Sequence, residues 1–326
     1  MAILMKRNKL KGISFGIFLL ATIFLGLCST SMAANTNYEA VLNKGTATFK
    51  VSQYNERKWE DTVDKELEPD DFFGGDSDEI GAKSRITIRN VDNYKWDLFD
   101  ALISIFDIES YIPDDLPNTT ETLLLLTYLS KDYVDEVYSE KYEVWEAITV
   151  KWDFEAGEFD ESPDEAENIM PIFKDPKDYK DLLDDYNDWA MNVSSIMILL
   201  GIEPFPILDG EDFLWALITS ELFTIASPFN SYLTTMIDAL ECDNTEVKGN
   251  TLIIEKEGEE DYFVEVIFND QGIQSSIVIK NDDDRIIYEI IQDNTDFIVL
   301  VVIGVIAASV AGIVIIVIKM RKKLKR

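Results

Sequence analysis

The sequence of 326 residues contains no histidine and only two cysteines, Cys28 and Cys242. Without an imidazole there is no base for a serine or cysteine triad, no HExxH zinc helix and no histidine metal ligand. Cys28 lies in an N-terminal segment that we expect to be removed, which leaves Cys242 alone. A single thiol excludes an internal disulfide and a cysteine-rich zinc site, and Cys242 is predicted to be a buried apolar residue.

Motifs for nucleotide binding and acyl transfer are missing as well. The chain has no Walker loop, no GxGxxG and no Asp-Thr/Ser-Gly pair, and its one GxSxG match lies in the N-terminal apolar segment at residues 12–16. No strand precedes that match and no histidine serves it. Carboxylate pairs remain as a source of hydrolase chemistry, but the sequence selects no particular pair. We therefore predict a protein that is not an enzyme, with no catalytic residue and no cofactor.

Basic residues are scarce in the middle of the chain and concentrated at its ends. Four stand between positions 6 and 11, and six close the sequence. All 62 acidic residues lie within residues 34–296, against 19 of the 29 basic ones, which gives this region a net charge of −43. Phosphate backbones repel such a surface, so the sequence predicts no nucleic-acid partner.

The N-terminus has the pattern of a secretory signal peptide. Basic residues come first, an apolar stretch follows, and small residues stand at Ser31 and Ala33. This order predicts a signal over residues 1–33 with cleavage after Ala33. An uncleaved anchor is the alternative, because the apolar run is long. Lipidation at Cys28 is disfavoured by the bulky Leu27 before it.

Residues 297–318 form a run of 22 residues without charge. As a helix this run is roughly 33 Å long, enough to cross a bilayer. A buried core helix is the alternative, but such helices are rarely apolar on every face. By the positive-inside rule, residues 319–326 are predicted to be a cytoplasmic tail and residues 34–296 an acidic extracellular domain. The expected localisation is the cell membrane, spanned once.

Three partners are predicted for this C-terminal segment. The first is the lipid bilayer, through residues 297–318. The second is a homodimer, since Gly304, Ala308 and Gly312 form a small-residue stripe that suits helix pairing, although small residues are common in membrane helices without a partner. The third is the layer of anionic lipid heads. Its predicted contacts are Lys319, Arg321, Lys322, Lys323, Lys325 and Arg326.

The leader, the acidic middle region and the terminal anchor with its basic tail together resemble the surface proteins of archaea, including those of Asgard lineages. The resemblance covers topology and composition, and no family motif accompanies it. It implies a cell-surface location and carries over no functional residue.

Hydrophobic periodicity predicts an α+β fold for residues 34–296, with an antiparallel β-sheet packed with a central group of helices, plus the transmembrane helix. A C-terminal four-strand meander is expected over 251–257, 261–270, 272–280 and 285–292. Other strands are expected within 38–54, 84–91 and 143–154, and a polar loop from residue 64. Helices are expected over 96–108, 175–201, 209–227 and 230–240; the second would be capped by Asp175 and Pro176 and ended by Gly201. Segments 96–108 and 120–134 also suit strands.

Clusters of acidic turn residues are the candidate ion sites. Asp76, Asp78 and Gly81 partly follow a calcium loop, but Ile80 and Thr87 stand where oxygen ligands belong. Residues 209–212 and 281–284 could chelate weakly. Turn residues facing water are the favoured alternative, so metal binding stays open. Glycosylation at the sequons of Asn118 and Asn192 also stays open.

Three functions are compatible with these features. The first is a membrane-anchored surface domain for binding, adhesion or envelope structure. The second is a membrane-tethered binder of a lipid or other hydrophobic ligand, suggested by six tryptophans and by a sheet-and-helix architecture loosely similar to periplasmic lipoprotein carriers. Core packing is the alternative role for these tryptophans. The third is a carboxylate-dependent hydrolase.

Overall fold

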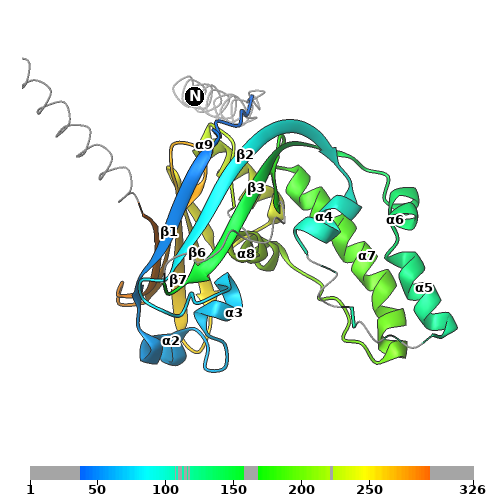
Figure 1. Cartoon of the computed structure of the whole chain (residues 1–326), viewed down its shortest axis with the longest axis horizontal. Coiled ribbons are helices and arrows are strands. Elements are labelled where there is room, and N and C mark those ends of the chain that lie inside the picture. Colours follow the sequence, from blue (N-terminus) through cyan, green and yellow to red (C-terminus); the bar gives the residue numbers. More distant parts are fainter. Residues whose placement is uncertain are drawn as a thin grey trace, which may run out of the picture. The chain divides into compact units, whose positions relative to one another are not determined.

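Nine antiparallel strands form one curled sheet in the computed structural model, which describes residues 37–106, 108, 112–113, 116, 118–157, 168–220 and 223–293 (Figure 1). Neighbouring strands follow the order β4-β3-β2-β1-β9-β8-β7-β6-β5. They belong to one unit that begins at Tyr38. The strands are β1 (Gly45–Tyr54), β2 (Lys83–Trp96), β3 (Tyr142–Glu155), β4 (Asn168–Phe173), β5 (Thr245–Lys248), β6 (Thr251–Glu257), β7 (Asp261–Phe268), β8 (Gln274–Asn281) and β9 (Ile286–Gln292).

Two consecutive meanders meet at the centre of this sheet. Strands β1 to β4 follow one another both in the chain and in space, as do β5 to β9, and β1 pairs with β9. This pairing places Lys50 opposite Ile291 and Tyr54 opposite Tyr288. The first and last described strands are therefore central neighbours, and the sheet is complete only when both are in place.

This architecture corrects the predicted fold class. The four segments expected at the C-terminus form β6 to β9, but they are part of a nine-stranded sheet and not a separate four-strand meander. The difference arises at β1, which buries Ala47, Phe49 and Val51 on one face and pairs along its edge with β9. A free edge of β9 would leave its backbone groups unpaired, and β1 supplies the partner.

The predicted membrane span also needs correction. No helix in the part of the chain that the structure describes is long and apolar enough to cross a bilayer. The expected span, 297–318, lies outside the described residues, as do the predicted signal peptide (1–33), the basic tail (319–326) and the stripe of Gly304, Ala308 and Gly312. The predicted localisation, a cell membrane spanned once, thus has no support in the structure.

The longest strands, β2 and β3, have 14 residues each and bend over together in Figure 1. Their register shifts between Ile88 and Asn90. A bulge of this kind adds a residue to one strand and increases the local bend and twist. The hairpin consequently contributes to two parts of the core, with Ile86 and Ile88 buried before the bulge and Trp96 and Val144 buried beyond it.

The described residues also form eight helices, of which α7, α8 and α9 lie between β4 and β5 in the chain. Helix α7 contacts α4, α5, α8 and α9, so it joins the helices at the end of the β2–β3 hairpin to those nearer the sheet centre. The helices are α2 (Glu56–Thr62), α3 (Pro69–Phe73), α4 (Leu98–Ser104), α5 (Thr120–Tyr128), α6 (Lys131–Val137), α7 (Asp178–Leu200), α8 (Gly210–Ser220) and α9 (Phe229–Leu240).

Helix α7 confirms most of its sequence prediction. Gly201 ends it in a left-handed conformation with φ 73°, and Gly201 N donates to the carbonyl of Ile198. Its start differs, because Asp175 accepts a hydrogen bond from Lys177 N in a turn that precedes the helix. The predicted inward stripe is buried throughout: Tyr179, Leu182, Leu183, Tyr186, Trp189, Ala190 and Val193.

Candidate functional site

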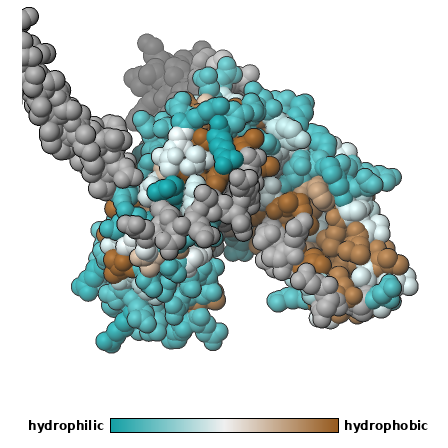
Figure 2. All heavy atoms as spheres, in the orientation of Figure 1, coloured by the Kyte–Doolittle hydropathy of each residue, from teal (hydrophilic) through white to brown (hydrophobic). Residues whose placement is uncertain are grey.

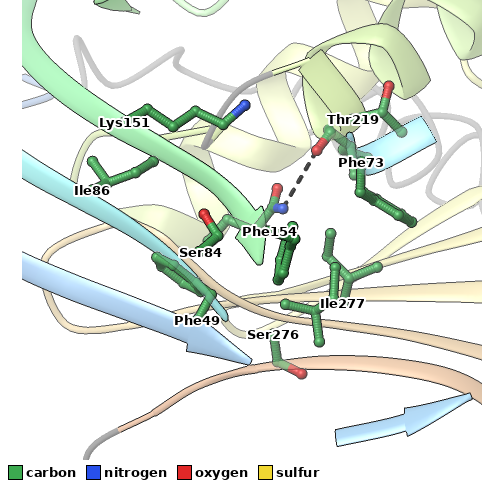
Figure 3. Close-up of a pocket in the computed structure, with 12 residues that line it drawn as sticks. Phe49, Phe73, Ser84, Ile86, Lys151, Phe154, Thr219, Ser276 and Ile277 are labelled. Carbon is green, nitrogen blue, oxygen red and sulfur yellow. Dashed lines mark hydrogen bonds between the residues drawn. The ribbon is translucent and has the colours of Figure 1, made fainter. Parts of the chain in front are cut away.

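A cavity lies on the buried face of the sheet (Figure 3). Its lining comes from five strands that are neighbours in the sheet, β3, β2, β1, β9 and β8, and from helices α3 and α8. Phe49 on β1 lies opposite Ser84 on β2, and Ile277 on β8 lies opposite Ile290 on β9. Opposite residues on antiparallel strands point to the same face, so these side chains gather around one space.

Most of this lining is apolar. Its apolar members are Phe49, Phe73, Ile86, Phe154, Ile218, Ile277 and Ile290. The atom-free space is about 460 Å³ including the open mouth, and about 50 Å³ of it admits the centre of a water-sized sphere. One water needs roughly 10–15 Å³ by the second measure. The space thus has room for a small apolar group, such as the end of an aliphatic chain, with the rest of a longer molecule at the mouth.

One buried acceptor in the lining has no partner among the residues that the structure describes. Gln274 is 5% exposed, and its Nε2 donates a long hydrogen bond of 3.4 Å to the carbonyl of Ile218, drawn as a dashed line in Figure 3. Its Oε1 receives no hydrogen bond from any described residue. An unpaired buried amide oxygen costs about 1–3 kcal/mol. A ligand hydroxyl or amide that donates to this oxygen would remove the cost.

Two of the three hydroxyls in the described lining, those of Ser84 and Thr219, already have acceptors. Ser84 Oγ donates to the carbonyl of Trp152 over 2.9 Å, and Thr219 Oγ1 donates to the carbonyl of Trp215 over 3.0 Å. No carboxylate or thiol belongs to the described residues that line the cavity. Neither hydroxyl therefore has a carboxylate or thiolate partner among the described residues of the lining.

Lys151 adds a cation to the cavity wall from β3 (Figure 3). Its side chain is 18% exposed, and Nζ lies 3.6 Å from the exposed carboxylate of Asp153. A lysine in this position covers apolar surface with its methylene stem and keeps its ammonium close to water. The cavity thus combines an apolar interior with an amide oxygen and an ammonium group.

One residue of each candidate ion-binding segment accepts a hydrogen bond from a backbone N–H in the structure. Asp76 accepts a hydrogen bond from Ala156 N, Asn281 accepts one from Arg285 N, and Asp209 accepts one from Asp212 N before helix α8. Asn281 and Asp209 thus act as turn and cap residues, and Asp76 joins its loop to the end of β3. Among the described residues, no three His, Cys, Asp or Glu side chains are placed to hold a metal ion.

A polar hollow surrounds Asp209 and Asp212, and Lys256 also lines it. The Lys256 ammonium lies 5.0 Å from the ring centre of Trp215, and burial lowers the pKa of Lys256. This hollow already contains a cation supplied by the chain, so its acidic residues carry no separate site.

The cavity residues were not singled out from the sequence, although a weak signal was present. Ser84 is a polar residue in register with the inward positions Ile86 and Ile88, and Gln274 precedes the apolar run of β8. A polar side chain on the core face of a strand is unusual and indicates a buried hydrogen-bonding role. The predicted burial of Cys242 is confirmed, since it is 9% exposed.

The first turn of α7 contains a carboxyl group with a raised pKa. Asp178 is about half buried, and desolvation followed by repulsion from Asp175 and Asp181 raises its pKa to about 7. Folding therefore favours the protonated form of this group.

We expect Asp178→Asn to stabilise the fold more at pH 8 than at pH 5. The folded state holds the Asp178 proton more tightly than the unfolded state, so the stability that this group contributes is fully present below the unfolded pKa of 3.8 and is lost as pH rises from there through about 7. The gain at pH 8 should be about 1 kcal/mol, after allowance for solvent screening and for the favourable position at a helix N-terminus. Urea denaturation at both pH values measures it.

Asp188→Asn is the matched control for this prediction, because Asp188 lies on the same helix and is exposed. Its effect should not change between pH 5 and pH 8 by more than a few tenths of a kcal/mol. Equal effects of Asp178→Asn at the two pH values would show that the group titrates normally.

No protein-family model, curated protein or solved structure matched the chain when the three were compared with it. No relative therefore assigns a role to the cavity, and the resemblance to archaeal surface proteins stays a prediction.

Proposed function

We propose that the protein is a non-enzymatic binding protein that holds a small amphiphile in the cavity between the sheet and helices α3 and α8. The observation that carries this proposal is the buried Oε1 of Gln274, an acceptor without a partner among the described residues, beside an aromatic and aliphatic lining. An apolar chain fits the lining, and a hydroxyl or amide group fits the oxygen.

The size of the cavity limits which classes of ligand can fit. Only about 50 Å³ admits the centre of a water-sized sphere, and the atom-free space of about 460 Å³ includes solvent at the open mouth. A medium-length alkyl chain with one hydrogen-bond donor matches both volumes better than a two-chain lipid. Lys151 at the wall allows a carboxylate head group as a weaker variant of the same ligand class.

This proposal favours ligand binding over the other two functions that the sequence allowed. A carboxylate-dependent hydrolase needs two acids near the bound substrate, and the described lining contains none. Adhesion or envelope structure requires a partner surface, for which the cavity is not evidence.

The experiment is a calorimetric titration of the full-length protein with 1-decanol, decanoate and decylamine. We expect dissociation constants in the micromolar range for decanol, with weaker binding of decanoate and no measurable binding of decylamine, because Lys151 repels an ammonium head group. No binding of decanol or decanoate up to their solubility limits would show that the cavity is only a packing defect.

Two variants locate the binding. Ile86→Phe places additional volume in the cavity and should weaken decanol binding at least tenfold, whereas Ile88→Phe, the next inward position of β2, lies outside the lining and should leave the affinity unchanged. Gln274→Leu removes the acceptor while keeping the size, so it should reduce the affinity for decanol about tenfold without loss of thermal stability. Unchanged affinity in both Ile86→Phe and Gln274→Leu would contradict the proposal.

A further inference from the structure

Helices α5 and α7 expose an aliphatic surface away from the cavity. Figure 2 shows it as a hydrophobic area over the helices labelled α4, α5 and α7 in Figure 1. Leu124 is 45% exposed, Ile198 is 63% exposed and Leu199 is 75% exposed. We call this surface the leucine patch, and its members are Leu123, Leu124, Leu126, Met191, Ile198 and Leu199.

The leucine patch belongs to two helices that pack on each other. Helix α5 buries Thr122 and Leu125 and turns its other leucines outward, while α7 buries Val193, Ile196 and Met197 and exposes Ile198 and Leu199. Contiguous aliphatic surface of this kind is uncommon on soluble monomers and marks a binding surface.

Charge is absent from the leucine patch and dense next to it. Residues 122–130 and 189–202 contain no charged side chain, in a chain that carries 62 acidic residues. The exposed stripe of α7 changes from Asp181, Asp184 and Asp188 to Met191 and Ile198 along the helix. The N-terminal part of α7 thus presents acidic side chains that suit solvent, and its C-terminal part presents apolar side chains that suit an apolar partner.

The composition of the leucine patch favours hydrocarbon over a protein surface. Protein interfaces concentrate Trp, Tyr and Arg at their energetic centres, and the patch has none of these among its members. A second copy of the chain would bring its own strongly acidic surface close, and that repulsion opposes self-association. The acyl region of a bilayer needs no directional contacts and adds no charge if its head groups are neutral.

We propose that the leucine patch is a docking surface for a neutral lipid bilayer, with the C-terminal end of α7 and the outer face of α5 immersed at the boundary between head groups and acyl chains. The acidic stripe around Asp184 and Asp188 stays in water and limits the depth. Anionic head groups weaken the contact because they face the acidic stripe.

The test places a fluorophore in the leucine patch of the full-length chain. Ser195, exposed on α7 between Met191 and Ile198, is changed to Cys in a background with Cys28→Ser and Cys242→Ser, and a label at Glu257→Cys, exposed at the end of β6, is the reference. With vesicles of phosphatidylcholine that carry a nitroxide near the head group, we expect the label at 195 to be quenched at least fivefold more than the label at 257. This comparison is independent of whether another segment of the chain also holds the vesicle.

Two substitutions check that the leucine patch causes the quenching. Leu124→Asp combined with Ile198→Asp should abolish the difference between the two labels, whereas Ile80→Asp, which changes an isoleucine that is 64% exposed outside the patch, should preserve it. Replacing a third of the lipid with phosphatidylglycerol should reduce quenching at 195 about twofold or more.

Three results would overturn the proposal. The first is equal quenching of the two labels, and the second is quenching at 195 that survives the double substitution. The third is excimer emission from a pyrene label at 195 without vesicles and without quenching on their addition, because the occupant would then be a second copy of this chain.

Discussion

Trp189→Ala is expected to cost about 4 kcal/mol of unfolding free energy, the range typical of large-to-small changes at buried aromatic positions. Trp189 is 0% exposed at the middle of α7, and its ring centre lies 4.9 Å from that of Phe205. Its Nε1 donates to the carbonyl of Tyr128, the last residue of α5, over 3.2 Å. The substitution therefore leaves a cavity and removes the hydrogen bond that joins α5 to α7.

Urea denaturation followed by far-UV circular dichroism measures this loss without depending on tryptophan fluorescence. Trp145→Ala is the matched control, because Trp145 is only partly buried. The ammonium nitrogen of Lys174 lies 5.7 Å from the centre of its ring. We expect that control to cost about 1 kcal/mol. A loss below 1 kcal/mol for Trp189→Ala would mean that α5 and α7 are held together by other contacts.

The sequence was sufficient for elements whose hydrophobic pattern is long and regular. Strand β7 alternates Tyr262, Val264, Val266 and Phe268 toward the core, and all four are buried as the period of two requires. Helix α7 was equally clear, because a stripe at helical spacing from Tyr179 to Val193, about four turns, leaves little choice of structure.

Short elements could not be predicted, because their signals lie in single side chains. Helix α3 falls in the expected polar loop from residue 64; it starts with Pro69, and the carboxylate of Asp71 accepts a hydrogen bond from Glu68 N at its N-terminus. Strand β5 has four residues and buries none of them. A pattern of such length does not distinguish a strand from a turn.

The pairing of β1 with β9 could not be predicted from the sequence, for a different reason. These strands are far apart in the chain, and each shows the same alternation that any half-buried strand would show. Periodicity tells which face is buried and says nothing about which strand lies alongside. The predicted fold class was therefore wrong at the level of the sheet, although β6 to β9 were found where strands were expected.

The cavity also depends on the pairing of β1 with β9, which the sequence did not predict. Its lining comes from five neighbouring strands, and two of them, β1 and β9, became neighbours only through the unpredicted pairing. Gln274 and Ser84 are 190 residues apart in the numbering, so nothing local brings them together. A binding site of this kind follows from topology, which explains why a search for catalytic motifs did not reach it.

The second large effect is expected in the turn before β8, where Gly272→Ala should lower the free energy of unfolding by about 3 kcal/mol. Gly272 has φ 76°, and a Cβ built on it would lie 2.1 Å from the carbonyl oxygen of Ile225. That carbonyl belongs to buried backbone, since Ile225 is 0% exposed and its N–H donates to Gly272 O over 2.9 Å. The methyl group must therefore separate two segments that are hydrogen-bonded, in addition to straining the backbone at positive φ.

Gly249→Ala separates these two contributions. Gly249 lies in the turn between β5 and β6 with φ 69°, and a Cβ there meets nothing within 4 Å. Its substitution should cost about 1 kcal/mol, the typical cost of backbone strain alone. Thermal and urea denaturation of both variants give the difference between the two losses, which is the steric part at Gly272. Equal losses would show that the segment around Ile225 yields without cost, and would mean that the contact between this turn and residues 223–227 is looser than the buried hydrogen bond indicates.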